Sequence, residues 1–278
     1  MTDIAIKIEH LNYVYSPGTA YEKHALKDIC LEIPHGEFVG IIGHTGSGKS
    51  TLIQHLNGLV KATDGALYYN GENIYQNGYD MRALRNQVGL VFQYPEYQLF
   101  EIDVLTDVCF GPKNQGLSKE ECEKRALEAL KLVGLKEKYY KSSPFELSGG
   151  QQRRVAFAGV LAMRPTTLVL DEPVAGLDPA SRADFLSLIE DLHTHHGLTV
   201  VMVSHNMNDI ARLADRLLVM HEGEVAFLGS PEELFTTHAV ELREIGLGIP
   251  HALRLANELR ELGFDLPTKL YEPETLAD

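Results

Sequence analysis

Short apolar runs alternate with longer amphipathic segments along most of the chain. Residues 38–42, 168–170 and 199–203 are continuous apolar runs that predict buried strands, and the last two are typical of parallel strands covered on both faces. Residues 4–9 and 26–33 predict two more strands, and a short strand is expected over 88–92. Strands of this length between helical segments predict the α/β class.

Turn signals mark an antiparallel part of the fold. Asn70-Gly71 lies between apolar residues within 66–74, which is a hairpin signal, and Glu222-Gly223 marks another. The strands at 4–9, 26–33 and 66–74 therefore predict a β-subdomain beside a three-layer α/β core.

Helix signals dominate the middle of the chain, where residues 95–165 are expected to form an inserted helical subdomain. Ser118, with Glu121 three residues later, predicts a capping box that opens a helix over 119–133. Asp178 and Pro179 predict the start of a further helix that continues to about Thr194.

The C-terminal part predicts a short helical extension over 246–278, after a main domain over 3–245. Ser230-Pro231 indicates one helix start, and Pro250 another, with Gly263 as the stop signal. The last helix carries an apolar stripe of Leu253, Ala256, Leu259 and Leu262. The stripe either packs on its own domain or joins two copies, and both interpretations stay open.

Composition excludes several classes of function. The net charge is −14, from 39 acidic and 25 basic residues, so the surface repels phosphate backbones and nucleic acid is not an expected partner. No apolar run approaches the roughly 18 residues that span a bilayer, and the N-terminus lacks the pattern of a secretory signal. We expect a cytoplasmic protein that reaches a membrane only through a partner.

Cysteines and clustered histidines carry weaker signals. Cys30, Cys109 and Cys122 have neither paired nor metal-ligand spacing, which favours small buried or neutral residues. His193, His195 and His196 resemble a metal-binding tract, but their position favours a helix C-terminus, where positive charge is stabilising.

A glycine-rich run follows the apolar run 38–42 and precedes a predicted helix. This strand–loop–helix context fits a phosphate loop, whose backbone N–H groups close around a triphosphate at a helix N-terminus. The lysine of the run would reach the β- and γ-phosphates, and its serine hydroxyl would bind Mg²⁺. The expected nucleotide-binding residues are Gly43, His44, Thr45, Gly46, Ser47, Gly48, Lys49, Ser50 and Thr51.

Two carboxylates, Asp171 and Glu172, end the strand at 168–170. In a phosphate-loop protein, this position predicts that Asp171 holds Mg²⁺ through water and that Glu172 polarises the attacking water. The alternative is that both carboxylates cap the next turn.

A second run, Leu147-Ser148-Gly149-Gly150-Gln151, resembles the signature sequence of ATP-binding cassette (ABC) ATPases. The resemblance covers residues 4 to about 236 and implies ATP and Mg²⁺ as cofactors. It implies that Gln93 is the glutamine that binds Mg²⁺ and water, and that His205 contacts the γ-phosphate. Asp178 matches the loop at the dimer interface. Tyr15 matches the aromatic that stacks on adenine, with Tyr13 as the rival.

In this family Ser148 and Gly149 close on the ATP held by a second subunit, so the resemblance implies a head-to-tail dimer. The partner is a paralogous ATPase or a second copy of the chain, and both stay open. A soluble ABC ATPase of DNA repair separates its phosphate loop from its signature by long coiled coils, whereas about a hundred residues intervene here. A translation factor needs two cassettes, and a phosphate-loop kinase leaves 147–151 unexplained.

Several local runs are similar to the second ATPase subunit of energy-coupling factor (ECF) transporters, with an ordinary ABC transporter ATPase as the alternative. They lie at 13–19, 43–46, 94–112, 143–146 and 158–162. The resemblance implies uptake of vitamins or metal ions, a transmembrane scaffold, separate substrate-binding membrane subunits, and a peripheral position on the cytoplasmic side of a prokaryotic membrane.

The segment after Gln93 combines aromatic with acidic residues. Tyr94, Tyr97 and Phe100 stand close together, and aromatic residues are enriched at interfaces. The neighbouring carboxylates are expected to meet a basic scaffold and to report the nucleotide state to the membrane. They are Glu96, Glu101, Asp103 and Asp107.

Overall fold

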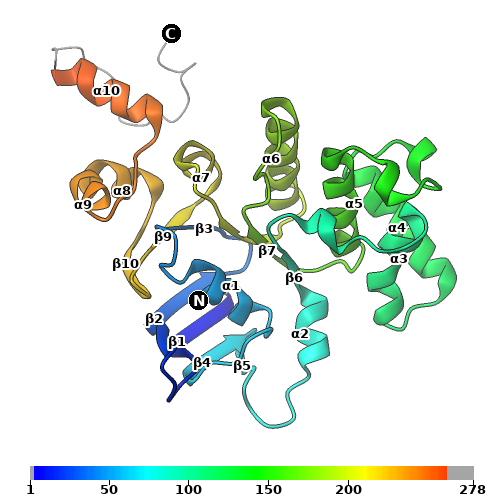
Figure 1. Cartoon of the computed structure of the whole chain (residues 1–278), viewed down its shortest axis with the longest axis horizontal. Helices are drawn as coiled ribbons and strands as arrows, with labels where there is room; N and C mark the ends of the chain where they lie inside the picture. Colours follow the sequence, from blue (N-terminus) through cyan, green and yellow to red (C-terminus); the bar gives the residue numbers. More distant parts are fainter. Residues whose placement is uncertain (1–2, 262–278) are drawn as a thin grey trace. The chain divides into compact units, whose positions relative to one another are not determined.

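The computed structural model describes residues 3–261 (Figure 1). These residues divide into two compact units. Unit 1 comprises the chain up to His55, residues 59–77 and the chain from Val201 onward. Unit 2 comprises residues 56–58 and 78–200. None of the helices within 3–261 combines the length and the apolar character that crossing a membrane requires.

Unit 1 contains an antiparallel sheet of four strands in the order β2-β1-β4-β5. The strands are β1 (Ile4–Tyr15), β2 (Lys23–Pro34), β4 (Asp64–Tyr69) and β5 (Glu72–Asn73). The predicted turn Asn70-Gly71 joins the last two, and both of its residues have the positive φ angles (49° and 82°) of a type I′ turn. The predicted hairpin is thus confirmed.

Strands β1 and β2 are longer than the apolar pattern predicts. β1 runs past residue 9 to Tyr15, and β2 begins at Lys23 instead of residue 26. The pairing of these strands shifts register after Ile8 and again after Leu11. Each shift breaks the alternation of buried and exposed positions. The sequence pattern therefore predicts only the part of each strand that lies on one side of the shifts.

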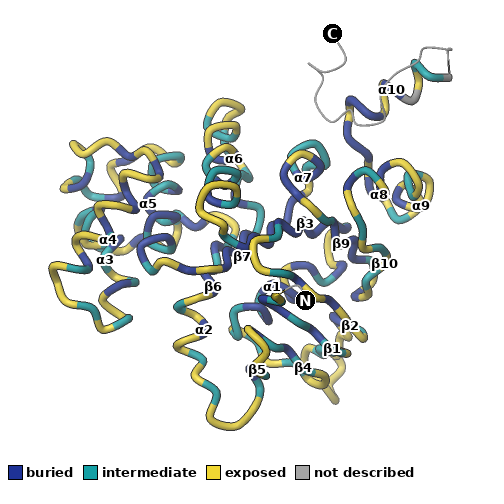
Figure 2. The backbone as a smooth tube through the Cα atoms, turned by 180° about the vertical axis from the view of Figure 1, so that it is seen from behind, coloured by how far each residue is buried: buried dark blue, intermediate teal, exposed yellow. Residues whose placement is uncertain are grey.

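The buried strand of unit 1 is β3 (Phe38–Ile42), all five residues of which are buried (Figure 2). It pairs in parallel with β9 (Arg216–His221), and β9 pairs antiparallel with β10 (Glu224–Gly229). The predicted turn Glu222-Gly223 joins β9 to β10. The amide of Ser204, directly after the strand β8 (Thr199–Val203), donates to the carbonyl of Ile41.

The helices of unit 1 are α1 (Lys49–Leu56, whose last residue is grouped with unit 2), α7 (Met207–Leu213), α8 (Pro231–Thr237), α9 (Ala239–Glu244) and α10 (His251–Glu261). Ser230 caps α8 through the amide of Glu233, in agreement with the predicted helix start. In α10, Leu253 and Ala256 are fully buried, so this half of the apolar stripe packs inside the monomer.

The structure describes the predicted C-terminal extension only as far as residue 261. Leu259 is half-buried, and Leu262 and Gly263 lie outside the described residues. The boundaries 3–245 and 246–278 stay a prediction.

In unit 2, β6 (Val88–Val91) pairs in parallel with β7 (Thr167–Asp171). The strand β8 (Thr199–Val203) crosses from unit 2 into unit 1, and the amide of its first residue donates to the carbonyl of Thr166. β6 ends one residue before the predicted Phe92. The short parallel strands expected from continuous apolar runs are thus present.

The helices of unit 2 follow the predicted positions closely. α3, α4 and α5 contact one another (Figure 1), as expected of the helical segment 95–165. α4 ends at Leu132, one residue early, because Val133 is its C-cap. Helix α2 has no counterpart in the predictions. The helices are α2 (Met81–Gln87), α3 (Val104–Asn114), α4 (Lys119–Leu132), α5 (Gly149–Leu161), α6 (Pro179–Thr194) and the 3₁₀ turns Pro95–Gln98, Glu137–Tyr139 and Pro144–Glu146.

Gly40 in β3 allows α7 to pack on the strand. A Cβ at this position would lie 2.4 Å from Ile210 Cγ1 and 2.7 Å from Leu217 Cδ2. We expect Gly40→Ala to lower the free energy of unfolding by about 1–3 kcal/mol through overpacking. Gly159→Ala is the control, because a Cβ there meets nothing within 4 Å. Urea unfolding of both variants measures the difference, and equal stabilities would contradict tight packing at Gly40.

Candidate nucleotide-binding and hydrolysis site

The loop between β3 and α1 closes around its own lysine. Gly46 and Gly48 have positive φ angles of 83° and 106°. A Cβ on Gly48 would lie 2.7 Å from the carbonyl oxygen of Ala25, so the position needs a glycine. Lys49 is 6% exposed, and its Nζ donates to the carbonyls of Gly43 (2.7 Å) and His44 (3.0 Å). The ammonium is thereby held within the loop.

The same loop combines an exposed helix N-terminus with a buried hydroxyl that lacks a hydrogen-bond partner within residues 3–261. Ser47 is fully buried, and its hydroxyl has no hydrogen-bond partner among the described residues. Buried hydroxyls are normally satisfied, so this one fits a loop that binds a ligand. Ser50 is exposed in the first turn of α1, where backbone N–H groups and the helix dipole favour a phosphate. The local geometry is that of a phosphate loop.

His205 shares a cavity with this loop. The residue follows β8 and is exposed, and the cavity of about 570 Å³ is also lined by Gly43, His44 and Thr45. Unit 1 therefore brings His205 to the loop, as its predicted contact with the γ-phosphate requires. Basic side chains that the sequence did not single out line the same cavity: Arg243, His251 and Arg254.

Two tyrosines lie beside α1. The Tyr15 hydroxyl is 3.0 Å from Thr51 Oγ1, and Tyr13 packs edge-on against both Tyr15 and His55. His55 Nδ1 donates to the carbonyl of Thr51 (2.7 Å), and burial lowers the pKa of its imidazole. Tyr15 is 38% exposed, whereas Tyr13 is half-buried behind it. Tyr15 thus presents the more accessible ring, which favours it for base stacking.

In unit 2, catalytic candidates converge at the carboxyl ends of β6 and β7. Asp171 is the last residue of β7, and Gln93 follows β6 after one intervening residue. Gln93 Nε2 lies 3.4 Å from Glu172 Oε2. Glu172 has φ +48°, a left-handed conformation that costs free energy in a non-glycine residue and clusters at functional sites.

The signature run forms the start of α5. The Ser148 hydroxyl accepts from the amide of Gln151, and the Gln151 side chain accepts from the amide of Ser148, which makes a complete capping box. Ser148 and Gly149 are exposed. The helix therefore presents an accessible N-terminus, which favours negative charge.

Asp178 is hydrogen-bonded to the start of α6. Its carboxylate accepts from the amides of Ala180 (3.1 Å) and Ser181 (3.0 Å), as the N-cap of α6. The side-chain hydrogen bond from Ser181, together with these amides, lowers the pKa of the carboxyl. The capping role predicted for Asp178 is confirmed.

A buried arginine, which the sequence did not indicate, ties three motifs of unit 2 together. Arg153 of α5 is bonded twice to Glu96, with Nε–Oε2 at 3.0 Å and Nη2–Oε1 at 2.7 Å. Its Nη1 donates to the carbonyls of Pro173 (3.3 Å) and Ala175 (2.6 Å). Arg153 and Glu96 are 3% and 13% exposed. One guanidinium thus links the signature helix, the segment after Gln93 and the segment after Glu172.

Comparison with known proteins identifies the family. The family model for ABC transporters matches residues 26–175, which is more than half of the chain. The chain belongs to the ABC transporter family. It is 52% identical, over 94% of its length and 91% of the relative's, to the energy-coupling factor transporter ATP-binding protein EcfA2 of Caldanaerobacter subterraneus subsp. tengcongensis.

Solved structures confirm the α/β fold of an ABC ATPase. cbiO1 from Clostridium perfringens, part of the ABC transporter complex cbiONQ, superposes with a TM-score of 0.77 at 38% identity over 93% of this chain and 99% of the other. A dimeric ATP-binding cassette bound to ADP and Pi in a post-hydrolysis state gives 0.72 at 34% identity, over 81% and 98%. The chain is thus an ATP-binding ABC ATPase.

The contribution of the Arg153–Glu96 ion pair to stability can be measured. Removing one partner of a buried ion pair leaves an uncompensated charge, so we expect Glu96→Ala to lower the free energy of unfolding by about 3–5 kcal/mol. Glu128→Ala is the control, because its pair with Arg164 is 52% exposed on both sides and contributes about 1 kcal/mol or less. Denaturant unfolding gives both values, and similar losses would mean that Arg153 does not depend on Glu96.

Proposed function

We propose that the chain is the ATP-hydrolysing subunit of an energy-coupling factor transporter, and that it drives uptake of vitamins or metal ions through membrane partners. The observation that carries this proposal is the 52% identity to the transporter subunit EcfA2 over almost the full length of both chains. The similarity to cbiO1 of the cbiONQ complex supports the same assignment.

Different residues of the chain would bind the nucleotide and activate the attacking water. Lys49 and the N–H groups of the phosphate loop would bind the triphosphate, and Tyr15 would stack on the adenine. Glu172 would take a proton from the attacking water, with Gln93 orienting both, and His205 would contact the γ-phosphate.

Oxygen donors suited to Mg²⁺ are present among these residues: the Ser50 hydroxyl, the Gln93 amide oxygen and the Asp171 carboxylate. When bound, the ion would neutralise charge on the phosphates. This donor set fits the ion, since Mg²⁺ prefers one or two carboxylates together with neutral oxygens and the substrate phosphates.

A second ATPase subunit would complete each site. Ser148 and Gly149 are exposed at the capped N-terminus of α5, where a γ-phosphate from another subunit would meet free N–H groups. The dimeric state of the related cassette bound to ADP and Pi supports this arrangement. The partner would be a paralogous ATPase or a second copy of the chain.

Three of the carboxylates expected to meet a membrane scaffold have partners within the chain. Glu96 is bonded to Arg153, Asp103 caps α3 through the amide of Thr106, and Asp107 accepts from the amides of Phe100 and Glu101. Glu96 is therefore less available to a basic scaffold than the sequence suggests, and Asp103 and Asp107 already have backbone partners. That the four carboxylates, Glu101 included, meet such a scaffold stays a prediction.

Large apolar side chains remain available on the same segment. Tyr97, Phe100, Ile102 and Phe110 are 85%, 57%, 81% and 43% exposed, and Phe100 packs edge-on against Phe110. We assign scaffold docking to this apolar cluster of four residues, since exposed aromatic clusters mark protein interfaces. The subunit would then sit peripherally on the cytoplasmic side of the membrane.

We expect Glu172→Gln to retain ATP binding and to lower the ATPase rate of the assembled transporter by about 10²–10⁴-fold, because the amide accepts no proton from water. Steady-state phosphate release and equilibrium nucleotide titration measure the two effects. Lys49→Ala is the contrasting variant, and it should weaken ATP binding itself. Near-normal turnover by Glu172→Gln would rule out its role as the general base.

We expect the double variant Tyr97→Ala/Ile102→Ala to weaken binding to the transmembrane scaffold about 30-fold, which corresponds to a hot-spot loss of about 2 kcal/mol. ATP binding should be unchanged. Tyr21→Ala is the matched control, because Tyr21 is also 85% exposed but lies in unit 1. Co-purification with the scaffold measures the effect, and equal recovery of all three proteins would exclude this docking surface.

A further inference from the structure

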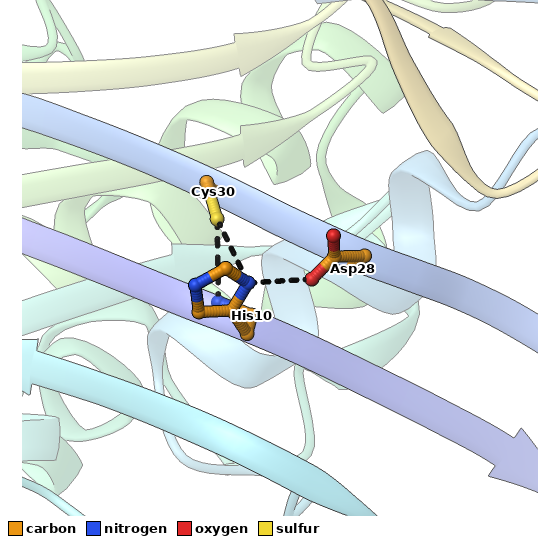
Figure 3. A group of neighbouring side chains, drawn as sticks. All are labelled: His10, Asp28 and Cys30. Carbon is orange, nitrogen blue, oxygen red and sulfur yellow. Dashed lines mark hydrogen bonds and ion pairs between the residues drawn. The ribbon is translucent and has the colours of Figure 1, made fainter.

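A group of metal-ligand side chains that the nucleotide chemistry does not use lies on the antiparallel sheet of unit 1 (Figure 3). His10 comes from β1, and Asp28 and Cys30 come from β2. Each offers one ligand atom, and these nitrogen, oxygen and sulfur atoms all lie within 4.8 Å of one another. Within residues 3–261, no other group of histidine, cysteine and carboxylate side chains meets this criterion.

Two bulges, one in each strand, bring these side chains together. After Ile8, the residues Glu9 and His10 of β1 lie opposite the single residue Cys30 of β2. After the next pair, Lys27 and Asp28 of β2 lie opposite one residue of β1. Bulges insert one extra residue and re-aim the side chains beside it.

The first bulge places His10 on the exposed face of the sheet. Ile6 and Ile8 are buried, so unbroken alternation would bury His10 as well. Instead His10 is exposed and Leu11 is buried. The change of phase therefore gives the imidazole the same face as Cys30.

The backbone at the cluster is held in an uncommon conformation. His10 and Asp28 have φ angles of +49° and +52°, in the left-handed region. Asn12 fastens both residues, because its Nδ2 donates to the His10 carbonyl (2.9 Å) and its Oδ1 accepts from the Asp28 amide (3.0 Å). The two ligand-bearing positions are thus fixed by one side chain.

The distances from His10 Nδ1 to the other two ligand atoms can be compared with those of a tetrahedral metal site, and Asp28 and Cys30 offer ligand atoms within 4.8 Å of each other. His10 Nδ1 lies 2.7 Å from Asp28 Oδ1 and 3.7 Å from Cys30 Sγ. Zinc bonds of about 2.0–2.3 Å at tetrahedral angles separate the ligand atoms by about 3.3–3.7 Å. A side-chain movement of about 0.6 Å by Asp28 or His10 would bring the Nδ1–Oδ1 distance into this range.

We propose that His10, Asp28 and Cys30 form a zinc-binding site that joins β1 to β2. A thiolate, an imidazole and a carboxylate together favour Zn²⁺ over Mg²⁺ and Ca²⁺, which prefer oxygen ligands. Three protein ligands leave the fourth position to water, since all three side chains are exposed. The site is separate from the Mg²⁺ of ATP hydrolysis and does not depend on the proposed transport function.

The test is metal titration of the full-length chain, prepared without a polyhistidine tag, without nucleotide and under reducing conditions. Calorimetry with Zn²⁺ should give one saturable site that excess Mg²⁺ does not compete for. Co²⁺ should produce the near-ultraviolet charge-transfer band of a thiolate ligand. Cys30→Ser should abolish this band, and Cys30→Ser and His10→Asn should each weaken Zn²⁺ binding at least about tenfold.

The variants are chosen to preserve the fold. Asparagine tolerates the left-handed conformation of His10, and all the substituted side chains are at least partly exposed. Cys109→Ser and His195→Asn are the controls, because they remove a thiol and an imidazole elsewhere and should leave Zn²⁺ affinity unchanged. Absence of saturable Zn²⁺ binding, or equal affinity in Cys30→Ser and the wild type, would overturn the proposal.

Discussion

The ion pair of the buried Arg153 guanidinium with Glu96 is the interaction on which the proposed catalytic residues of unit 2 depend. A buried charge is costly unless it is paired and hydrogen-bonded, and Arg153 is paired with Glu96 and also donates to two backbone carbonyls. These partners come from segments that follow Gln93 and Glu172. Because one rigid, planar group binds both segments, we expect the relative placement of Gln93 and Glu172 to depend on this ion pair.

The features predicted well from sequence are those that short segments determine. The phosphate loop, the Asn70-Gly71 turn and the helix that starts at Pro179 each depend on residues within a few positions of one another. Their physics is local, because a glycine conformation or a helix cap is determined by the residues of the segment itself. The family resemblance then assigned roles to these positions, which no local pattern supplies.

The features missed from sequence depend on partners far apart in the chain. Arg153 has the appearance of a surface arginine on a helix until Glu96, 57 positions earlier, is placed beside it. Sequence placed Glu96 itself among carboxylates facing a partner, although it is almost buried. The bulges at His10 and Asp28 were not predicted for a related reason, because a change of register exists only relative to the neighbouring strand.

Several motif residues combine a capping role in the fold with a proposed role in nucleotide binding. Ser148 and Gln151 complete the capping box of α5, and Asp178 caps α6. A cap satisfies some N–H groups of the first helical turn and leaves the others directed outward, so the conformation that stabilises the helix also creates an anion-binding end. Loss of activity after substituting such a residue therefore has two causes, which only a stability measurement on the same variant separates.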